Sequence, residues 1–123
     1  MKDTDKEPLI RAFLFACTDK SEAECFERPL FGTDKVYATI VTRVRRGDLL
    51  FLNNLDTNTL YGVFKAVSDG GVNIEPEVWN GKYPYQVKVE SLGEKIALKN
   101  ARKILRRFKI KRNTQIFSRE PID

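Results

Sequence analysis

Residues 60–79 have the sequence LYGVFKAVSDGGVNIEPEVW, which changes from strand-like to loop-like halfway along. Residues 60–67 are expected to form a β-strand, in which every second side chain falls on the same face. Gly62 leaves a gap in side-chain volume on one face, where we expect another group to pack closely. The second half, with Gly70-Gly71 and Pro76, predicts a turn-rich loop that contains Trp79, and such loops carry binding sites more often than cores do.

The segments before this stretch predict strands and one helix. Residues 10–16 form a short apolar run, which is typical of a central strand buried on both faces. A helix is expected over residues 21–28, with Thr18 or Asp19 as its N-cap and Pro29 after its end. Three further elements are expected before residue 60: an alternating strand over 35–44, an apolar strand over 49–52 and a hairpin loop over 53–58.

Two elements are expected after the loop. Residues 85–91 alternate as a half-exposed strand. Asn100 is expected to cap a last helix that runs to about Phe108, with one apolar face made of Ile104, Leu105 and Phe108.

Composition excludes several classes of function. The chain of 123 residues is 41% hydrophobic and 32% charged, which favours one folded domain over disorder. It contains no His, so Ser-His-Asp and Cys-His catalysis are excluded. Cys17 and Cys25 alone cannot make a zinc site, and we expect both to be buried thiols. The prediction is a cytoplasmic monomer that is not an enzyme and needs no metal or cofactor, with no membrane span and no signal peptide.

The positive charge is concentrated late in the chain. Residues 1–34 contain five basic and eight acidic side chains, whereas the remaining residues contain seventeen basic and nine acidic ones. Residues 99–112 hold eight basic residues and no acid, which favours a polyanionic partner. From charge alone, solubility or the enrichment found in proteins from hot environments explains the excess equally well. The expected phosphate contacts are Arg102, Lys103, Arg106, Arg107, Lys109, Arg45 and Arg46.

Four motifs follow one another along residues 30–87. They are Leu30-Phe31-Gly32, Leu50-Phe51-Leu52-Asn53, Leu60-x-Gly62-x-Phe64-x-Ala66-x-Ser68-x-Gly70-Gly71-x-Asn73-Ile74-x-Pro76-x-x-Trp79 and Tyr83-Pro84-x-Gln86-Val87. Together they resemble the DCD (development and cell death) domain over about residues 10–90. The resemblance implies an α+β fold, a small PUA-like β-barrel with flanking helices, as a single domain over residues 1–123. EVE and YTH domains, several of which bind RNA or modified bases, are expected to share this fold.

The resemblance also implies a base-binding pocket. YTH domains hold a methylated adenine in an aromatic cage; by position Phe31 matches its first wall, where YTH domains have tryptophan, and Trp79 matches its second. The third wall falls among Lys82, Tyr83 and Tyr85, with Tyr83 the nearest. Cys17 and Thr18 match a segment that contacts the edge of the base. Asn73 is a further candidate, although a hydrogen bond to its own turn is the favoured interpretation.

The leading prediction is a nucleic-acid-binding module that prefers RNA to DNA and holds a normal or methylated base in an aromatic pocket beside a basic helix. Trp79 has an alternative role, because a tryptophan that plugs the barrel would be buried, whereas a cage wall would be partly exposed. The alternative function is a protein-interaction adaptor in a stress response, since relatives of this type are multidomain and stress-related. An RNA-processing enzyme is the third alternative, but the Gly-x-Lys-x-x-Glu-x-Arg pattern of the related ASCH group is missing.

Overall fold

Strand β1 (Arg11–Cys17) lies at the centre of the fold, as its apolar sequence predicts. Phe13, Leu14 and Phe15 are buried, so both faces of the strand are covered. The computed structural model describes residues 11–107 and 114–118. Within these residues β1 pairs in parallel with β3 (Leu49–Asn54) and antiparallel with β7 (Thr114–Ser118).

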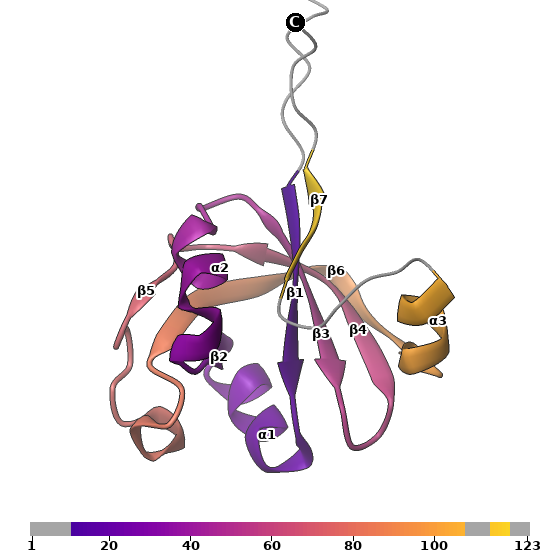
Figure 1. The fold of residues 1–123 in the computed structure, drawn as a ribbon, viewed down its shortest axis with the longest axis horizontal. Coiled ribbons are helices and arrows are strands. Elements are labelled where there is room, and N and C mark those ends of the chain that lie inside the picture. The colour runs from indigo at the N-terminus through magenta and orange to yellow at the C-terminus, as the bar shows by residue number, and fades with distance from the viewer. Residues whose placement is uncertain (1–10, 108–113, 119–123) are drawn as a thin grey trace, which may run out of the picture.

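The other strands complete a curved, nearly closed barrel (Figure 1). They are β2 (Leu30–Thr33), β4 (Thr59–Ala66), β5 (Gly71–Val72) and β6 (Tyr85–Lys99). The described strands follow the order β2-β6-β4-β3-β1-β7, and β5 also pairs with β6. The structure confirms the predicted α+β barrel with flanking helices.

Helix α1 (Asp19–Glu27) follows β1 directly and begins two residues earlier than expected. Of the two predicted N-cap residues, Thr18 and Asp19, the structure has Thr18, and the Thr18 N–H donates to the Ser21 hydroxyl oxygen at 3.0 Å. Pro29 lies just beyond its end. The helix thus turns the chain back so that β2 runs beside β6.

The strand predicted over residues 35–44 is wrong. The structure has a 3₁₀ turn, η2 (Lys35–Tyr37), followed by helix α2 (Ala38–Arg43). Asp34 starts this segment, because its carboxylate accepts the Val36 N–H at 3.0 Å. Val41 of α2 is fully buried, and so is Val44, which follows the helix in an extended conformation, so tertiary packing overrides the β-propensity of this segment.

Strands β3 and β4 form the predicted hairpin. The expected close approach at Gly62 is confirmed, because a Cβ atom there would lie 2.5 Å from the ring of Phe51. Strand β6 extends to Lys99, well beyond the predicted end at Ser91. Its second half pairs with β4 while its side chains stay exposed, so no burial pattern in the sequence marks it.

Helix α3 (Ala101–Arg107) is the predicted basic helix. Ala101 and Leu105 are buried, while Phe108 of the predicted apolar face lies outside the described residues. The side chain that accepts a hydrogen bond at its start is that of Asn58, from the Arg102 N–H at 2.7 Å, and not the predicted Asn100. A loop residue distant in sequence therefore replaces the expected local cap.

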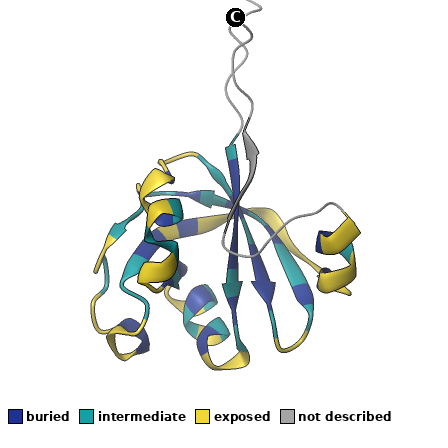
Figure 2. Cartoon of the chain, viewed as in Figure 1, coloured by how far each residue is buried: buried dark blue, intermediate teal, exposed yellow. Residues whose placement is uncertain are grey.

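The core fills the barrel and the space under α1 and α2 (Figure 2). Along residues 11–107 and 114–118, no helix is long and apolar enough to cross a membrane.

Candidate nucleic-acid interface

A cavity of about 310 Å³ opens where the barrel does not close. Among the described strands β1 and β2 are not hydrogen-bonded to each other, and β7 covers β1 only along Arg11–Leu14. The resulting gap is surrounded by the C-terminal end of β1, by α1 and β2, and by the 3₁₀ turns η2 and η3 (Val78–Gly81). The cavity is lined by Ala16, Cys17, Thr18, Ser21, Cys25, Gly32, Thr33, Asp34, Val36, Tyr37, Leu55, Trp79 and Tyr83.

Trp79 forms one wall of this cavity although only 8% of its surface is exposed. Its indole N–H donates to the carbonyl oxygen of Ser21 at 3.2 Å, and its ring meets that of Tyr83 edge-on at 5.7 Å. Its backbone has φ of 55°, in the left-handed region that a bulky residue rarely adopts. Trp79 therefore combines both alternatives considered for it: it is buried as a scaffold residue and also presents part of its ring to the cavity.

The loop that carries Trp79 is held by a buried amide. Gln86 is 1% exposed, and its side chain accepts the Glu75 N–H at 2.8 Å. The same side chain donates to the carbonyl oxygens of Glu75 at 3.2 Å and Tyr83 at 3.0 Å. These bonds tie the two sides of the loop together, so the positions of Trp79 and Tyr83 are fixed before any ligand arrives.

Cys17 and Cys25 form a thiol wall opposite the loop. Both are free and buried, as the sequence predicts. The pKa of Cys25 is raised well above 9.0, first by its hydrogen bond with Cys17 and then by burial. Cys25 is therefore a neutral thiol at physiological pH.

The structure brings four of the predicted pocket residues together. Trp79, Tyr83, Cys17 and Thr18 all line the cavity. Phe31 does not, because it is completely buried between Phe15, at 5.8 Å between ring centroids, and Phe64, at 5.0 Å. Phe31 is therefore a core residue and does not form a wall of the cavity.

Tyr85 and Asn73 also lie outside the cavity lining. Tyr85 pairs with Thr33 and Val72 across the sheet and packs against the core. Asn73 is exposed, has φ of 54°, and donates its backbone N–H to Pro84 at 2.6 Å. This bond joins Asn73 to a backbone group eleven residues later, so the predicted hydrogen bond of the Asn73 side chain to its own turn stays a prediction.

Sequence reasoning missed several residues that line the cavity. Thr33 and Asp34 follow Gly32 directly, so the motif Leu30-Phe31-Gly32 pointed to the right strand but to the wrong residue. The sequence predicts a strand at Tyr37, whereas in the structure Tyr37 belongs to η2 and lines the cavity. Leu55 comes from the β3–β4 loop, and no local signal links that loop to β1.

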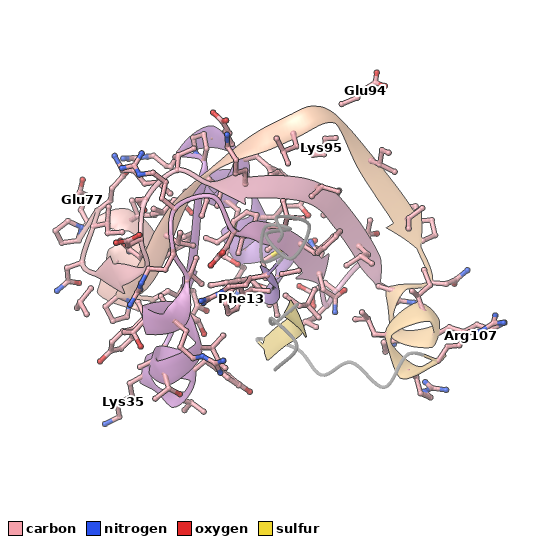
Figure 3. The ribbon with its side chains drawn as sticks, turned by 90° about the horizontal axis from the view of Figure 1, so that it is seen from above. Phe13, Lys35, Glu77, Glu94, Lys95 and Arg107 are labelled. Atoms are coloured by element: carbon pink, nitrogen blue, oxygen red, sulfur yellow. The ribbon has the colours of Figure 1, made fainter. Side chains whose placement is uncertain are left out.

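The start of α3 lies beside the cavity. Arg102 donates to the carbonyl oxygen of Leu55 at 3.4 Å, and the Leu55 N–H donates to Cys17 at 2.9 Å. Arg102, Lys103, Arg106 and Arg107 are exposed, and Figure 3 shows Arg107 pointing away from the body of the protein. Lys109, also predicted to contact phosphate, lies outside the described residues.

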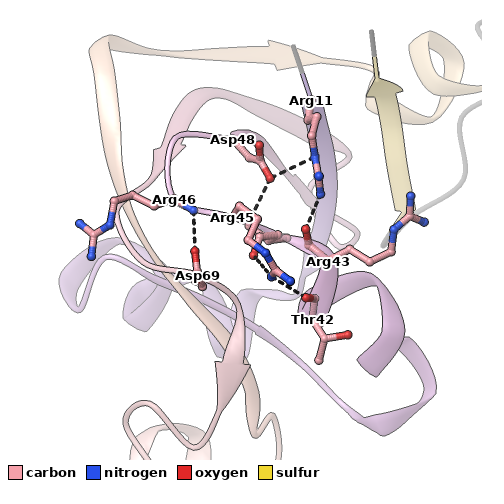
Figure 4. A network of polar contacts seen from close by, with 8 residues as sticks. Arg11, Thr42, Arg43, Arg45, Arg46, Asp48 and Asp69 are labelled. Atoms are coloured by element: carbon pink, nitrogen blue, oxygen red, sulfur yellow. Dashed lines mark hydrogen bonds and ion pairs between the residues drawn. The ribbon is translucent and has the colours of Figure 1, made fainter. Parts of the chain in front are cut away.

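Arg45 and Arg46 precede β3, whereas Leu55 follows it, and β3 itself is about 17 Å long. The Arg45 guanidinium donates to the carbonyl oxygens of Thr42 at 2.8 Å and Val44 at 3.0 Å (Figure 4). The Arg46 N–H donates to Asp69 at 2.9 Å. The structure therefore does not bring this turn together with α3 and the cavity into one track.

A second cavity of about 300 Å³ lies on the other side of Trp79 and Tyr83. It shares four lining residues with the first, namely Thr18, Ser21, Trp79 and Tyr83. Its remaining lining is Lys20, Glu24, Glu77, Asn80 and Lys82, so it is more charged than the first. No group of three His, Cys, Asp or Glu side chains within residues 11–107 and 114–118 is placed to hold a metal ion.

Solved structures of YTH domains share this fold. The YTH domain-containing protein mmi1 in an RNA complex aligns with a TM-score of 0.64 at 13% identity, covering 88% of this chain and 72% of that one. The Pho92 YTH domain in complex with m6A aligns with a TM-score of 0.62 at 16% identity, covering 88% of this chain and 76% of that one. At these identities the likeness shows the fold alone.

Sequence comparison gives the family. The DCD domain-containing protein NRP-B of Glycine max is 36% identical over 91 residues, which are 68% of this chain but 28% of that relative. The chain thus spans little more than a quarter of that protein's length. The family model of the development and cell death domain matches residues 11–117, almost the whole barrel, and the chain therefore belongs to the development and cell death domain family.

Proposed function

We propose that this domain binds single-stranded RNA, with one unpaired base in the cavity beside Trp79 and neighbouring phosphates on α3. One observation carries the proposal: Arg102 of the basic helix contacts Leu55, and Leu55 lines the cavity. A cavity with aromatic walls next to a positive surface offers the two things that single strands need, a stacking partner and phosphate contacts. The proposal assigns no catalytic step.

The size and walls of the cavity support a base as its occupant. A volume of about 310 Å³ is at the lower end of the range for small-molecule pockets. Stacking on an aromatic side chain is worth about 1–3 kcal/mol per base. The neutral Cys25 thiol and the rings of Trp79 and Tyr83 would also accept a methyl group on the base.

The fold neighbours give independent support, since the mmi1 structure is an RNA complex and the Pho92 structure is a complex with m6A. The finer proposal is that this domain also accepts a methylated adenine. The cavity lacks one of the aromatic walls expected from the resemblance to YTH domains, because Phe31 is buried in the core. We therefore expect a preference for the methylated base that depends on Trp79 and Tyr83 alone.

Trp79 is the only tryptophan, so its fluorescence reports directly on the cavity. Titration with a single-stranded RNA should quench this emission, and a duplex of the same sequence should not, because paired bases cannot enter. Inorganic polyphosphate tests the charge alone. If polyphosphate and RNA bind with equal affinity and RNA does not quench the Trp79 emission, no base enters the cavity and charge alone explains binding.

A protein-interaction adaptor, the alternative function, has one observation in its favour. An apolar hollow of about 160 Å³ on the outer side of the barrel is lined by Phe51, Leu60, Gly62, Val63, Ile96 and Leu98. Ile96 is 59% exposed, so Ile96→Ser should leave the fold intact. Under the RNA proposal this variant binds RNA like the wild type; loss of RNA binding in it would favour the outer face over the cavity.

A further inference from the structure

We propose that Asp34 makes the cavity select a base with an exocyclic amino group, namely adenine, cytosine or guanine, over uracil. This inference rests on the proposed function and names which bases the same site takes. It comes from the chemistry of the cavity lining.

Asp34 brings the only formal charge to the cavity. Of the thirteen described residues that line it, Asp34 is the only acid, and none is Lys, Arg or His. The other polar groups are hydroxyls and thiols, such as those of Thr33 and Tyr37. A phosphate is therefore repelled from the cavity and stays on the side of α3, whereas a group with N–H donors is attracted.

The carboxylate is held in place by the backbone. Asp34 lies between β2 and η2 as the N-cap residue of η2, and its Oδ1 accepts the Val36 N–H at 3.0 Å. An ionised carboxylate has two acceptor oxygens, and no residue of the described chain donates to Oδ2. One oxygen thus fixes the orientation of the group while the other is left to accept from a ligand.

Bases differ in what they offer to such an acceptor. Adenine and cytosine present amino donors at the position where uracil, like thymine, presents a carbonyl oxygen, and guanine carries an amino group at N2. Uracil has a single N–H on this edge, at N3, with a carbonyl oxygen on each side. A uracil that donates this N–H to the carboxylate therefore brings repelled oxygens close to it, whereas an amino group does not. An adenine with one methyl on its amino group keeps one N–H, so selection by Asp34 is compatible with a methylated base.

The test uses short uridine oligonucleotides in which the central base is adenine, cytosine, guanine or uracil. Asp34→Asn removes the charge and keeps the shape, and Asn also caps helix starts well, so the fold should persist. Asp69→Asn is the matched control, because Asp69 is also exposed and its Oδ1 accepts the Arg46 N–H at 2.9 Å at the far end of β3. Affinities are measured by fluorescence anisotropy at one salt concentration.

The wild type and Asp69→Asn should bind the amino-bearing strands about tenfold more tightly than the all-uridine strand, the difference expected for one hydrogen bond to a charged group. Asp34→Asn should lose most of this preference. Equal binding of all strands by the wild type, or an unchanged preference in Asp34→Asn, would overturn the role of Asp34 and leave RNA binding intact. Failure of the wild type to bind any strand would overturn the proposed function and this inference with it.

Discussion

Gly32 lies where the ring of Trp79 leaves no room for a side chain. A Cβ atom at this position would be 2.6 Å from Cζ3 of the indole and 3.1 Å from the carbonyl oxygen of Tyr83. Both atoms belong to the loop that Gln86 holds, so neither can move without cost. The small residue in the motif Leu30-Phe31-Gly32 is thus required by the cavity wall.

Gly32→Ala should therefore destabilise the protein by about 1–3 kcal/mol, the usual cost of forcing atoms into a packed site. Gly71→Ala is the control, since its nearest contact would be an ordinary 3.6 Å from Ile74. Urea denaturation followed by Trp79 fluorescence gives both values. Equal stability of the two variants would show that the loop yields easily.

Trp79 has two roles, because it is buried in the fold and also lines the cavity. Trp79→Ala should cost about 3–5 kcal/mol of stability through the cavity that it leaves. Trp79→Phe keeps an aromatic face and loses the bond to Ser21, so it should cost only about 1 kcal/mol from that bond plus a smaller packing loss. RNA affinity is compared between the wild type and Trp79→Phe only, because an alanine variant that unfolds would say nothing about stacking. If Trp79→Ala leaves the stability unchanged, Trp79 does not support the fold.

The residues that line the cavity show how far a sequence motif reaches. The dense series of Gly, Asn, Pro and aromatic residues predicts a loop around Trp79 and Tyr83, and both residues line the cavity; their role in binding a base stays a prediction. Phe31 was misplaced because a phenylalanine beside a glycine looks the same whether it faces the core or a pocket. Asp34 was missed because an exposed aspartate after a strand has an ordinary role as a cap, and only its three-dimensional neighbours give it another.

At the scale of elements, α3 provides the sharpest test of phosphate binding. Replacing Arg102, Arg106 and Arg107 by Gln should weaken RNA binding and reduce the log-log salt slope by about 0.7 for each lost contact. The same three changes at Arg43, Arg45 and Arg46 remove equal charge at the far end of β3, and we expect them to leave the slope nearly unchanged. If both triple variants flatten the slope equally, net charge and not α3 attracts the strand.

Elements also show why part of the fold escaped prediction. β1 and the β3–β4 hairpin have patterns that match their burial, and they were predicted correctly. The sequence of helix α2 predicts a strand because Thr, Ile and Val alternate along it, whereas in the structure Val41 is its one fully buried residue and Val44 follows the helix in an extended conformation. The second half of β6 buries no side chain, so only its backbone pairing with β4 defines it.

At the scale of the whole molecule, two groups make stability depend on alkaline pH. Burial and a hydrogen bond with Glu22 raise the pKa of Tyr61 from 10.0 to about 12, and the pKa of Cys25 is raised well above 9.0. Both groups lose their protons more easily in the unfolded chain. The stability that they contribute is fully present below about pH 9 and is lost as the pH rises toward 12.

Unfolding free energy measured by urea denaturation should therefore fall steadily from pH 9 upward. Tyr61→Phe keeps the ring and removes the hydroxyl, so it should flatten the part of this decline between 10.0 and about 12. Tyr37→Phe is the control, because it removes the hydroxyl of a tyrosine that is not the one bonded to Glu22. A decline of the same steepness in both variants would contradict the role of Tyr61.

The pairing of β1 with β7 joins two ends of the described chain, with Arg11 opposite Ser118. During synthesis β1 emerges first and stays without this neighbour until residues 114–118 have left the ribosome. Until then one edge of a strand rich in phenylalanine exposes backbone N–H and C=O groups that another nascent chain can pair with. Such long-range closure also makes folding slow, so the time between the emergence of β1 and the arrival of β7 is when this protein is most exposed to aggregation.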